Sequence, residues 1–132
     1  MNILKKIELI IQELGYDYVL ESNGDIIVKN PPVSFRDGNT YIQIVGGVCP
    51  ITPNLVPDIN RANRYFERRN ITFQYGEWIM IKNNNRLLAQ RIPANDFNSL
   101  SKSDAKEVII GFITEFSKEN DAVMLDLLVG NI

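Results

Sequence analysis

The chain has 132 residues, of which 45% are hydrophobic and 23% are charged, and its formal net charge is -2. This length is typical of one globular domain that can bury a core, so we expect a single domain over residues 1–132. The sequence pI near 5.1 argues against general nucleic-acid binding, because that function usually requires a basic surface. Any basic patch must therefore be local.

Two residue types that support catalysis are missing or scarce. Histidine is absent, so the commonest general base and metal ligand is lacking and no Ser-His or Cys-His pair can form. Cys49 is the single cysteine, which excludes an internal disulfide and a multi-cysteine zinc site. It lies among apolar residues in "GVCPI", and we interpret it as a buried structural thiol. We expect a protein that is not an enzyme and holds no cofactor or metal.

The N-terminal segment and the most apolar segment both favour a cytoplasmic protein. Glu8 and Glu13 interrupt the apolar residues of the first helix pattern, so no signal-peptide core forms. The run "VIIGFI" at 108–113 is too short to cross a bilayer. We therefore expect a cytoplasmic location and no membrane partner.

The first half of the chain predicts one helix and then three or four antiparallel strands. Apolar residues recur at helical spacing over residues 4–14, and Gly15 stands where a helix often stops. Strand patterns follow in "YDYVLES", "DIIVK", "VSF" and "TYIQIV". Asn23-Gly24 predicts a type I′ turn between the first two strands. Gly46-Gly47 is interpreted as the end of this block of strands rather than as a phosphate-binding loop.

The second half predicts a helix, a hairpin and a final helix. Pro57 suits the first position of a helix that runs to about Arg69, and Asn70 suits the left-handed conformation that ends it. The segments "ITFQYGEWIMIK" and "RLLAQRI" predict a hairpin around "NNN", and Ser101 begins the last helix. The fold class that follows is α+β, with an antiparallel sheet, helices packed on it and the order α-βββ-α-ββ-α.

The middle helix contains four arginines in "INRANRYFERRN". At about 100° per residue, Arg61, Arg64 and Arg68 form a stripe nearly opposite the apolar residues. Arg69 lies at the edge of the apolar side, where its stem can cover the core. We favour the interpretation that the stripe is the solvent face of an amphipathic helix. The alternative is that its guanidinium groups bind carboxylates or phosphates of a partner.

The aromatic residues also have two interpretations. Phe73, Tyr75 and Trp78 could form a binding platform on a sheet, with Trp78 and Met80 on an exposed face. Core packing is the interpretation that we favour, although Trp78 is retained as a candidate partner-binding residue. Phe66 and Phe112 lie on the apolar faces of their predicted helices, so we expect both in the core.

The last helix has a broad apolar face and additional apolar residues outside it. Ile110, Met124 and Leu128 lie off the main stripe, so either the helix breaks near "SKEND" and turns its end inward or it carries a second apolar surface. A second surface of this kind would be covered by a homodimer. The acidic residues of this helix are interpreted as solvated charge: Asp104, Glu107, Glu115, Glu119, Asp121 and Asp126.

The order of elements and several local features resemble the YbjN-like proteins, which share their fold with the type III secretion chaperones. The resemblance rests on the first helix, the antiparallel strands, the paired asparagines of "INRANRYF", the hairpin "WIMIKNNNRLLAQR" and the long final helix, and it covers most of the chain. It implies an α+β domain, often dimeric, that binds a protein partner and catalyses nothing.

From the residues and the resemblance together we expect a noncatalytic protein-binding or chaperone-like regulatory module, with an unidentified protein as its partner. The alternative is a regulator that binds an anion or a nucleic acid through Arg61, Arg64 and Arg68. The acidic composition makes nucleic acid the less favoured partner.

Overall fold

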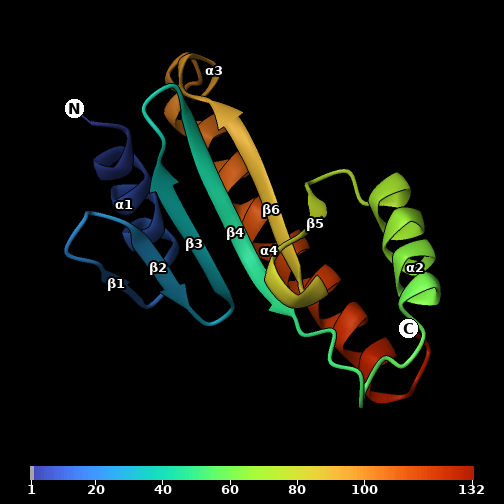
Figure 1. The fold of residues 1–132 in the computed structure, drawn as a ribbon. Coiled ribbons are helices and arrows are strands. Elements are labelled where there is room, and N and C mark those ends of the chain that lie inside the picture. Colours follow the sequence, from blue (N-terminus) through green and yellow to red (C-terminus); the bar gives the residue numbers. More distant parts are fainter. Residues whose placement is uncertain (1) are drawn as a thin grey trace.

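A computed structural model describes residues 2–132 and confirms the α+β class (Figure 1). Six antiparallel strands form one sheet in the order β1-β2-β3-β4-β6-β5. The strands are β1 (Tyr18–Leu20), β2 (Ile26–Lys29), β3 (Pro32–Asp37), β4 (Tyr41–Cys49), β5 (Glu77–Met80) and β6 (Arg86–Pro93). The helices are α1 (Ile3–Leu14), α2 (Ile59–Thr72), α3 (Ala94–Asn98) and α4 (Lys102–Leu128), with the short 3-10 helix η1 (Lys82–Asn84). The short helix α3 was not predicted.

Several helix ends follow from the local sequence as expected. Gly15 ends α1 in the left-handed conformation, with φ at 81°. The Ser101 hydroxyl accepts a hydrogen bond from the Asp104 backbone N–H at 3.1 Å and so caps α4. The Asp58 carboxylate caps α2 in the same way by accepting from the Arg61 N–H. The helix therefore begins at Ile59, and the placement of Pro57 at its first position was wrong.

The turn between β1 and β2 differs from the type I′ prediction. The Gly24 N–H donates to the Glu21 carbonyl at 2.9 Å, and Gly24 has a φ of 92° whereas Asn23 has a negative φ. A type I′ turn needs positive φ at both central residues, so the prediction was wrong. The loop has three residues, Ser22 to Gly24, between the closing pair Glu21 and Asp25, and Gly24 supplies its single left-handed position.

Gly46 and Gly47 do not end β4, which continues to Cys49 with a shift of register after Val45. A Cβ atom on Gly46 would lie 2.5 Å from the Phe116 ring, and one on Gly47 would lie 2.8 Å from Asn120 Oδ1. The two glycines therefore allow α4 to approach the sheet closely. The expected strand end was wrong because the glycines serve packing between layers.

The helices α1 and α4 cover one face of the sheet, and the opposite face is open (Figure 1). On the covered face, strand residues such as Ile26, Phe35 and Ile44 are fully buried. On the open face, one row of cross-strand neighbours crosses all six strands: Val19, Ile27, Ser34, Val45, Ala89 and Glu77. Because side chains alternate along a strand, this row is the side of the sheet that faces away from the helices.

The final helix α4 is continuous from Lys102 to Leu128, so of the two alternatives for this helix the break near "SKEND" is excluded. Its buried residues follow one stripe that includes Ile109, Phe116 and Val123. Along residues 2–132, no helix is both long enough and apolar enough to cross a membrane.

Candidate functional site

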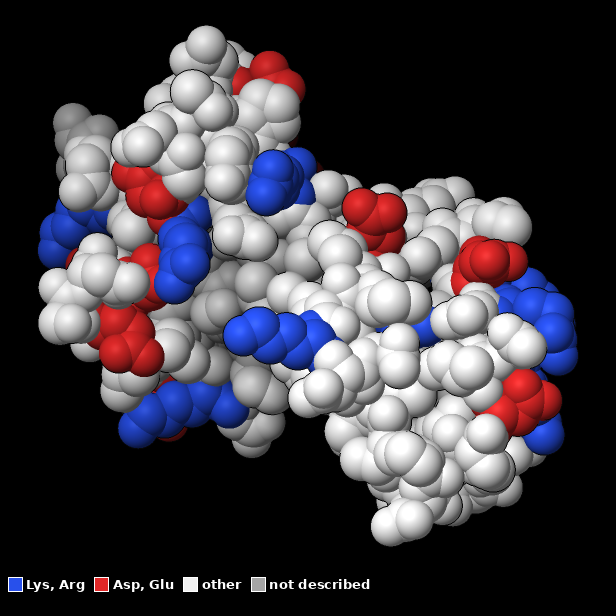
Figure 2. Space-filling model, in the orientation of Figure 1, with Lys and Arg blue, Asp and Glu red and all other residues white. Residues whose placement is uncertain are grey.

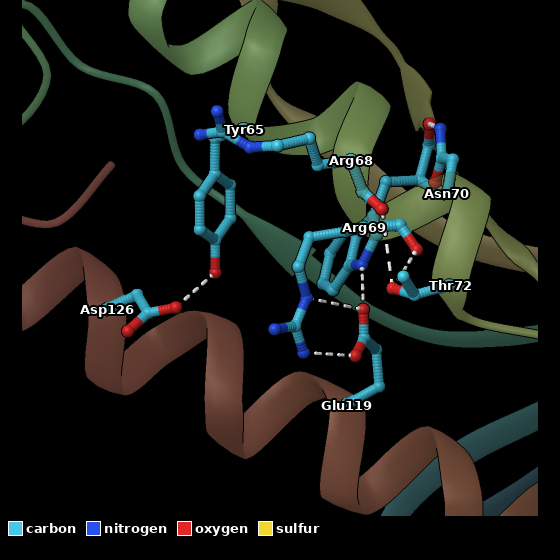
Figure 3. A network of polar contacts seen from close by, with 8 residues as sticks. Tyr65, Arg68, Arg69, Asn70, Thr72, Glu119 and Asp126 are labelled. Atoms are coloured by element: carbon cyan, nitrogen blue, oxygen red, sulfur yellow. Dashed lines mark hydrogen bonds and ion pairs between the residues drawn. The ribbon is translucent and has the colours of Figure 1, made fainter.

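A buried carboxylate joins α4, α2 and β5. Glu119 on α4 is only 6% exposed and accepts hydrogen bonds from both nitrogens of the Arg69 side chain that face it, with Nε at 3.2 Å from Oε2 (Figure 3). The Trp78 indole N–H donates to the same Oε2 at 2.8 Å. Removing a carboxylate from water costs free energy unless it is paired and hydrogen-bonded, and this carboxylate is both. The interpretation of Glu119 as solvated charge was therefore wrong.

The contacts around Glu119 and Arg69 raise the pKa values of Arg69 and of the nearby Tyr65. The hydrogen bond to Glu119 holds the pKa of the Arg69 guanidinium above its ordinary value, so Arg69 stays charged. Two turns further along α4, Asp126 accepts a hydrogen bond from the Tyr65 hydroxyl at 2.5 Å. Burial and this bond raise the pKa of Tyr65 well above its usual range. These contacts hold α2 against the C-terminal half of α4.

Arg86 fixes the other side of α2. It is buried at the start of β6, and its guanidinium donates to the Asn63 side chain and to the Asn84 carbonyl. It also lies 5.2 Å from the centroid of the Phe66 ring, at cation-π distance. Burial lowers the pKa of Arg86. Local sequence patterns did not single out Arg86, because its partners come from other elements.

Asn70 covers the backbone of Trp78 on the outer edge of β5, the last strand of the sheet. The Trp78 backbone N–H donates to Asn70 Oδ1 at 2.6 Å, and Asn70 Nδ2 donates to the Trp78 carbonyl at 3.1 Å. The side-chain amide thus pairs with the backbone of Trp78 as a neighbouring strand would, at one of the two outward-facing residues of β5. Asn70 was expected to end α2, but α2 continues to Thr72 and this side chain is used for the sheet instead.

Within residues 2–132, nothing covers the opposite edge, β1, in this way. Lys29 N–H donates to the Asp17 carbonyl, and Glu21 N–H donates to the Asp25 carbonyl, so the odd-numbered residues of this segment bond to β2. In an antiparallel pair the intervening residues direct their backbone groups outward. Tyr18 and Leu20 therefore present N–H and C=O groups at the free edge.

The side chains around β1 leave its outer edge accessible. Leu20 and Val19 are 53% and 41% exposed. Tyr18 points toward α1, where its hydroxyl donates to Glu8 at 2.7 Å and accepts from Gln12 at 2.6 Å. The Tyr18 hydrogen bond, followed by the one from Lys5, lowers the pKa of Glu8. The strand is thus held through a side chain while its backbone edge stays uncovered.

The three arginines of the α2 stripe are exposed, as expected for its solvent face. Figure 2 shows basic side chains on the outer side of α2, with acidic ones among them. Within residues 2–132, Arg61, Arg64 and Arg68 form no ion pair, and Arg61 donates only to the Gly130 carbonyl at 3.4 Å. The stripe is accessible, but nothing in its geometry selects a ligand.

The remaining candidate residues divide between core and surface. Trp78 is 3% exposed and belongs to the core, so it is unavailable as a surface platform, whereas Met80 is exposed. Phe66 is buried, and Phe112 is half-buried against Phe116. Cys49 is buried, as expected, and burial raises the pKa of its thiol to about 11.

The proposed dimer residues do not share one environment. Ile110 and Leu128 are exposed on the continuous helix α4, while Met124 is half-buried and packs against the core. The part of the chain that the structure describes contains no group of three or more acidic or cysteine side chains that could hold a metal ion.

Comparison with known proteins supports the fold and leaves the function open. No family model matches the chain, and no curated protein matches it. An uncharacterised protein from Methanothermobacter thermautotrophicus is similar in structure, with a TM-score of 0.61, 16% identity and coverage of 94% of this chain and 95% of the other. YbjN from E. coli, described as a candidate transcription regulator, has a TM-score of 0.62, 10% identity and coverage of 89% and 88%. The chain therefore has a YbjN-like fold.

Replacing Glu119 tests the buried contact between α2, α4 and β5. We expect Glu119→Ala to lower the free energy of unfolding by about 3 kcal/mol, because it leaves Arg69 without its partner and the Trp78 indole N–H without an acceptor. Urea denaturation followed by circular dichroism measures the change. Asp121→Ala is the matched control on an exposed position of α4 and should change stability by less than about 0.5 kcal/mol. Equal stabilities of the two variants would contradict the assignment.

The arginine stripe can be tested in the same experiment. We expect Arg64→Ala to change the free energy of unfolding by less than about 0.5 kcal/mol, because the side chain is exposed. Arg69→Ala, on the same helix, should lower it by about 2 kcal/mol because a charged hydrogen-bond partner of Glu119 is lost. A large loss for Arg64→Ala would show that the stripe supports the fold.

Proposed function

We propose that this protein is a noncatalytic protein-binding regulatory module that takes an extended segment of its partner at the edge of β1. The observation that carries the proposal is the contrast between the two edges of the sheet. At the β5 edge Asn70 makes two hydrogen bonds to the backbone of Trp78, whereas at the β1 edge both outward-facing residues, Tyr18 and Leu20, are left open.

An open edge is a template for another strand, because its N–H and C=O groups lie in a row at the spacing of a β-ladder. Proteins usually protect such an edge with proline, lysine, a bulge or a covering element. Within β1 the sequence is Tyr-Val-Leu, which contains none of these protective residues. Its short length limits self-association, yet it still offers two N–H donors and two C=O acceptors to a partner.

The likeness to known proteins agrees with a binding role. YbjN is described as a candidate transcription regulator, and the resemblance to secretion chaperones implies binding of extended protein segments. The open face of the sheet adds apolar surface beside the edge, since Val19 and Ile27 lie next to each other on it. A partner strand at β1 could therefore place its own apolar side chains beside this row.

The second candidate function is recognition of an anion or a nucleic acid by the arginine stripe. Three exposed and unpaired guanidinium groups on α2 favour it, and the acidic net charge of the chain opposes it. Titration with DNA and with RNA at several salt concentrations separates the candidates. Phosphate contacts give a steep salt dependence, which an Arg61, Arg64 and Arg68 triple alanine variant would abolish.

A homodimer through α4 remains a prediction. We expect Leu128→Asp to shift the protein from dimer to monomer in sedimentation while its circular dichroism stays unchanged, because a two-fold interface loses two contacts for one substitution. Met124→Asp should instead destabilise the subunit, since Met124 packs against the core. An unchanged dimer for Leu128→Asp, or a wild-type protein that is monomeric throughout, would exclude α4 from the contact.

The open edge can be tested with a synthetic peptide of alternating threonine and valine, flanked by serine and glycine for solubility. We expect the peptide to slow hydrogen exchange of the Tyr18 and Leu20 amides, measured by NMR, because these N–H groups gain acceptors.

Leu20→Pro is the matching variant. It removes one outward donor without removing a bond to β2, and proline is tolerated on edge strands whose N–H faces solvent. The variant should remain folded by circular dichroism and lose peptide binding. Edge binding would be contradicted if hydrogen exchange at both amides of the wild-type protein stayed unchanged even with the peptide in large excess.

A further inference from the structure

We infer that the partner segment carries basic side chains on both sides of an apolar centre, and that a second copy of this chain is the wrong occupant for the β1 edge. The inference rests on the proposed function, since it names the chemistry of the strand that β1 accepts. It is carried by two carboxylates, Asp17 and Glu21, which stand directly before and after β1.

The two carboxylates lie on one face with Val19 between them. Residues 17, 19 and 21 alternate with the outward-bonding Tyr18 and Leu20, so their side chains project to the open face of the sheet. Asp17, Val19 and Glu21 are all exposed. A strand added in register would place one residue opposite each of them.

The charged residues near Asp17 and Glu21 form no ion pairs with them in the described chain, so both carboxylates are available to a partner strand. Asp25 lies across the ladder from Glu21, but its carboxylate is bound by Arg36 at 3.0 Å. Lys29 lies across the ladder from Asp17, and the two form no ion pair in the described chain. Glu8 is bound by Lys5 and by Tyr18 on the other face of the sheet. The open side of the edge therefore carries two unpaired negative charges.

The same charges oppose pairing of β1 with β1 of a second copy. Only one antiparallel register pairs all three residues of β1 with the three residues of β1 in the other copy. In this register Tyr18 faces Leu20, and Val19 faces Val19. In that register Asp17 of each copy stands opposite Glu21 of the other, which creates two like-charge pairs. Like charges directly opposite one another destabilise a strand pair. A strand from a different chain can place lysine or arginine at both positions.

The matching segment has the pattern basic-x-apolar-x-basic, in which x is any residue compatible with a strand. The apolar residue meets Val19, and each basic residue meets a carboxylate. The backbone supplies the bonds to Tyr18 and Leu20, while the alternate side chains supply selectivity. Because the ion pairs are exposed, their contribution should weaken as salt concentration rises.

Two peptides that differ only in charge test the inference: acetyl-Ser-Lys-Thr-Val-Thr-Lys-Ser-amide and its counterpart with glutamate in place of both lysines. Binding is followed by NMR at the Tyr18 and Leu20 amides in low salt. We expect the lysine peptide to bind about tenfold more tightly than the glutamate peptide, because two attractive cross-strand pairs replace two repulsive ones.

A double variant, Asp17→Lys with Glu21→Lys, should reverse this preference. Its matched control is Glu107→Lys with Asp121→Lys, which makes the same change of net charge at exposed positions on α4. The control should keep the preference of the wild-type protein, since the carboxylates beside β1 are intact. A reversal in both double variants would show that net charge, rather than the β1 edge, selects the peptide and would overturn the inference.

The outcomes separate the inference from the proposed function. Equal binding of the two peptides with protected Tyr18 and Leu20 amides would overturn the charge preference and leave edge binding standing. Binding of neither peptide would overturn edge binding itself. A wild-type dimer that Leu20→Pro converts to a folded monomer in sedimentation would show that a second copy occupies the edge.

Discussion

The buried Glu119 carboxylate is the contact on which the arrangement of the second half of the chain depends. It accepts from Arg69 of α2 and from Trp78 of β5, so one side chain of α4 fixes two other elements. A charge in this position is tolerated only if every partner is present. The position of α2 that results brings Asn70 to the backbone of Trp78 at the β5 edge. The cover on Trp78 at the β5 edge therefore depends on the buried ion pair, together with the contacts of Tyr65 and Arg86 that also hold α2.

Local patterns predicted most elements, because the spacing of apolar residues and the capping residues act within a few positions. They placed α1, the first four strands, α2, the hairpin and the cap of α4, and they assigned the arginine stripe to solvent. They missed Glu119, although a signal was present: it lies three residues after Phe116 and four before Val123, within the buried stripe of α4. An acidic residue on the buried face of a helix indicates that it has a buried partner. The partners here belong to α2 and β5, which only the tertiary structure brings together.

Asn70 and Gly46 show why the other errors occurred. Asn70 has the chemistry of a helix end, and Gly46-Gly47 has that of a strand end, so the local interpretation was reasonable in both cases. Contacts between distant segments decided the outcome: the edge of β5 uses the Asn70 amide, and Phe116 occupies the space that a side chain at Gly46 would need. The open edge of β1 was missed for a related reason, since strand order and hydrogen-bond direction are properties of the assembled sheet.

The α1 helix gives the open edge a further property, because it fixes β1 without covering it. The Tyr18 hydroxyl is held by Glu8 and Gln12, and Glu8 is itself held by Lys5, so the strand is anchored from the covered face of the sheet. These bonds use the side chain alone and leave the outward N–H and C=O of Tyr18 available. A binding edge that is already ordered loses less conformational entropy when a partner strand arrives. A three-residue strand can therefore serve as a docking edge, since its neighbours supply the rigidity that its length does not.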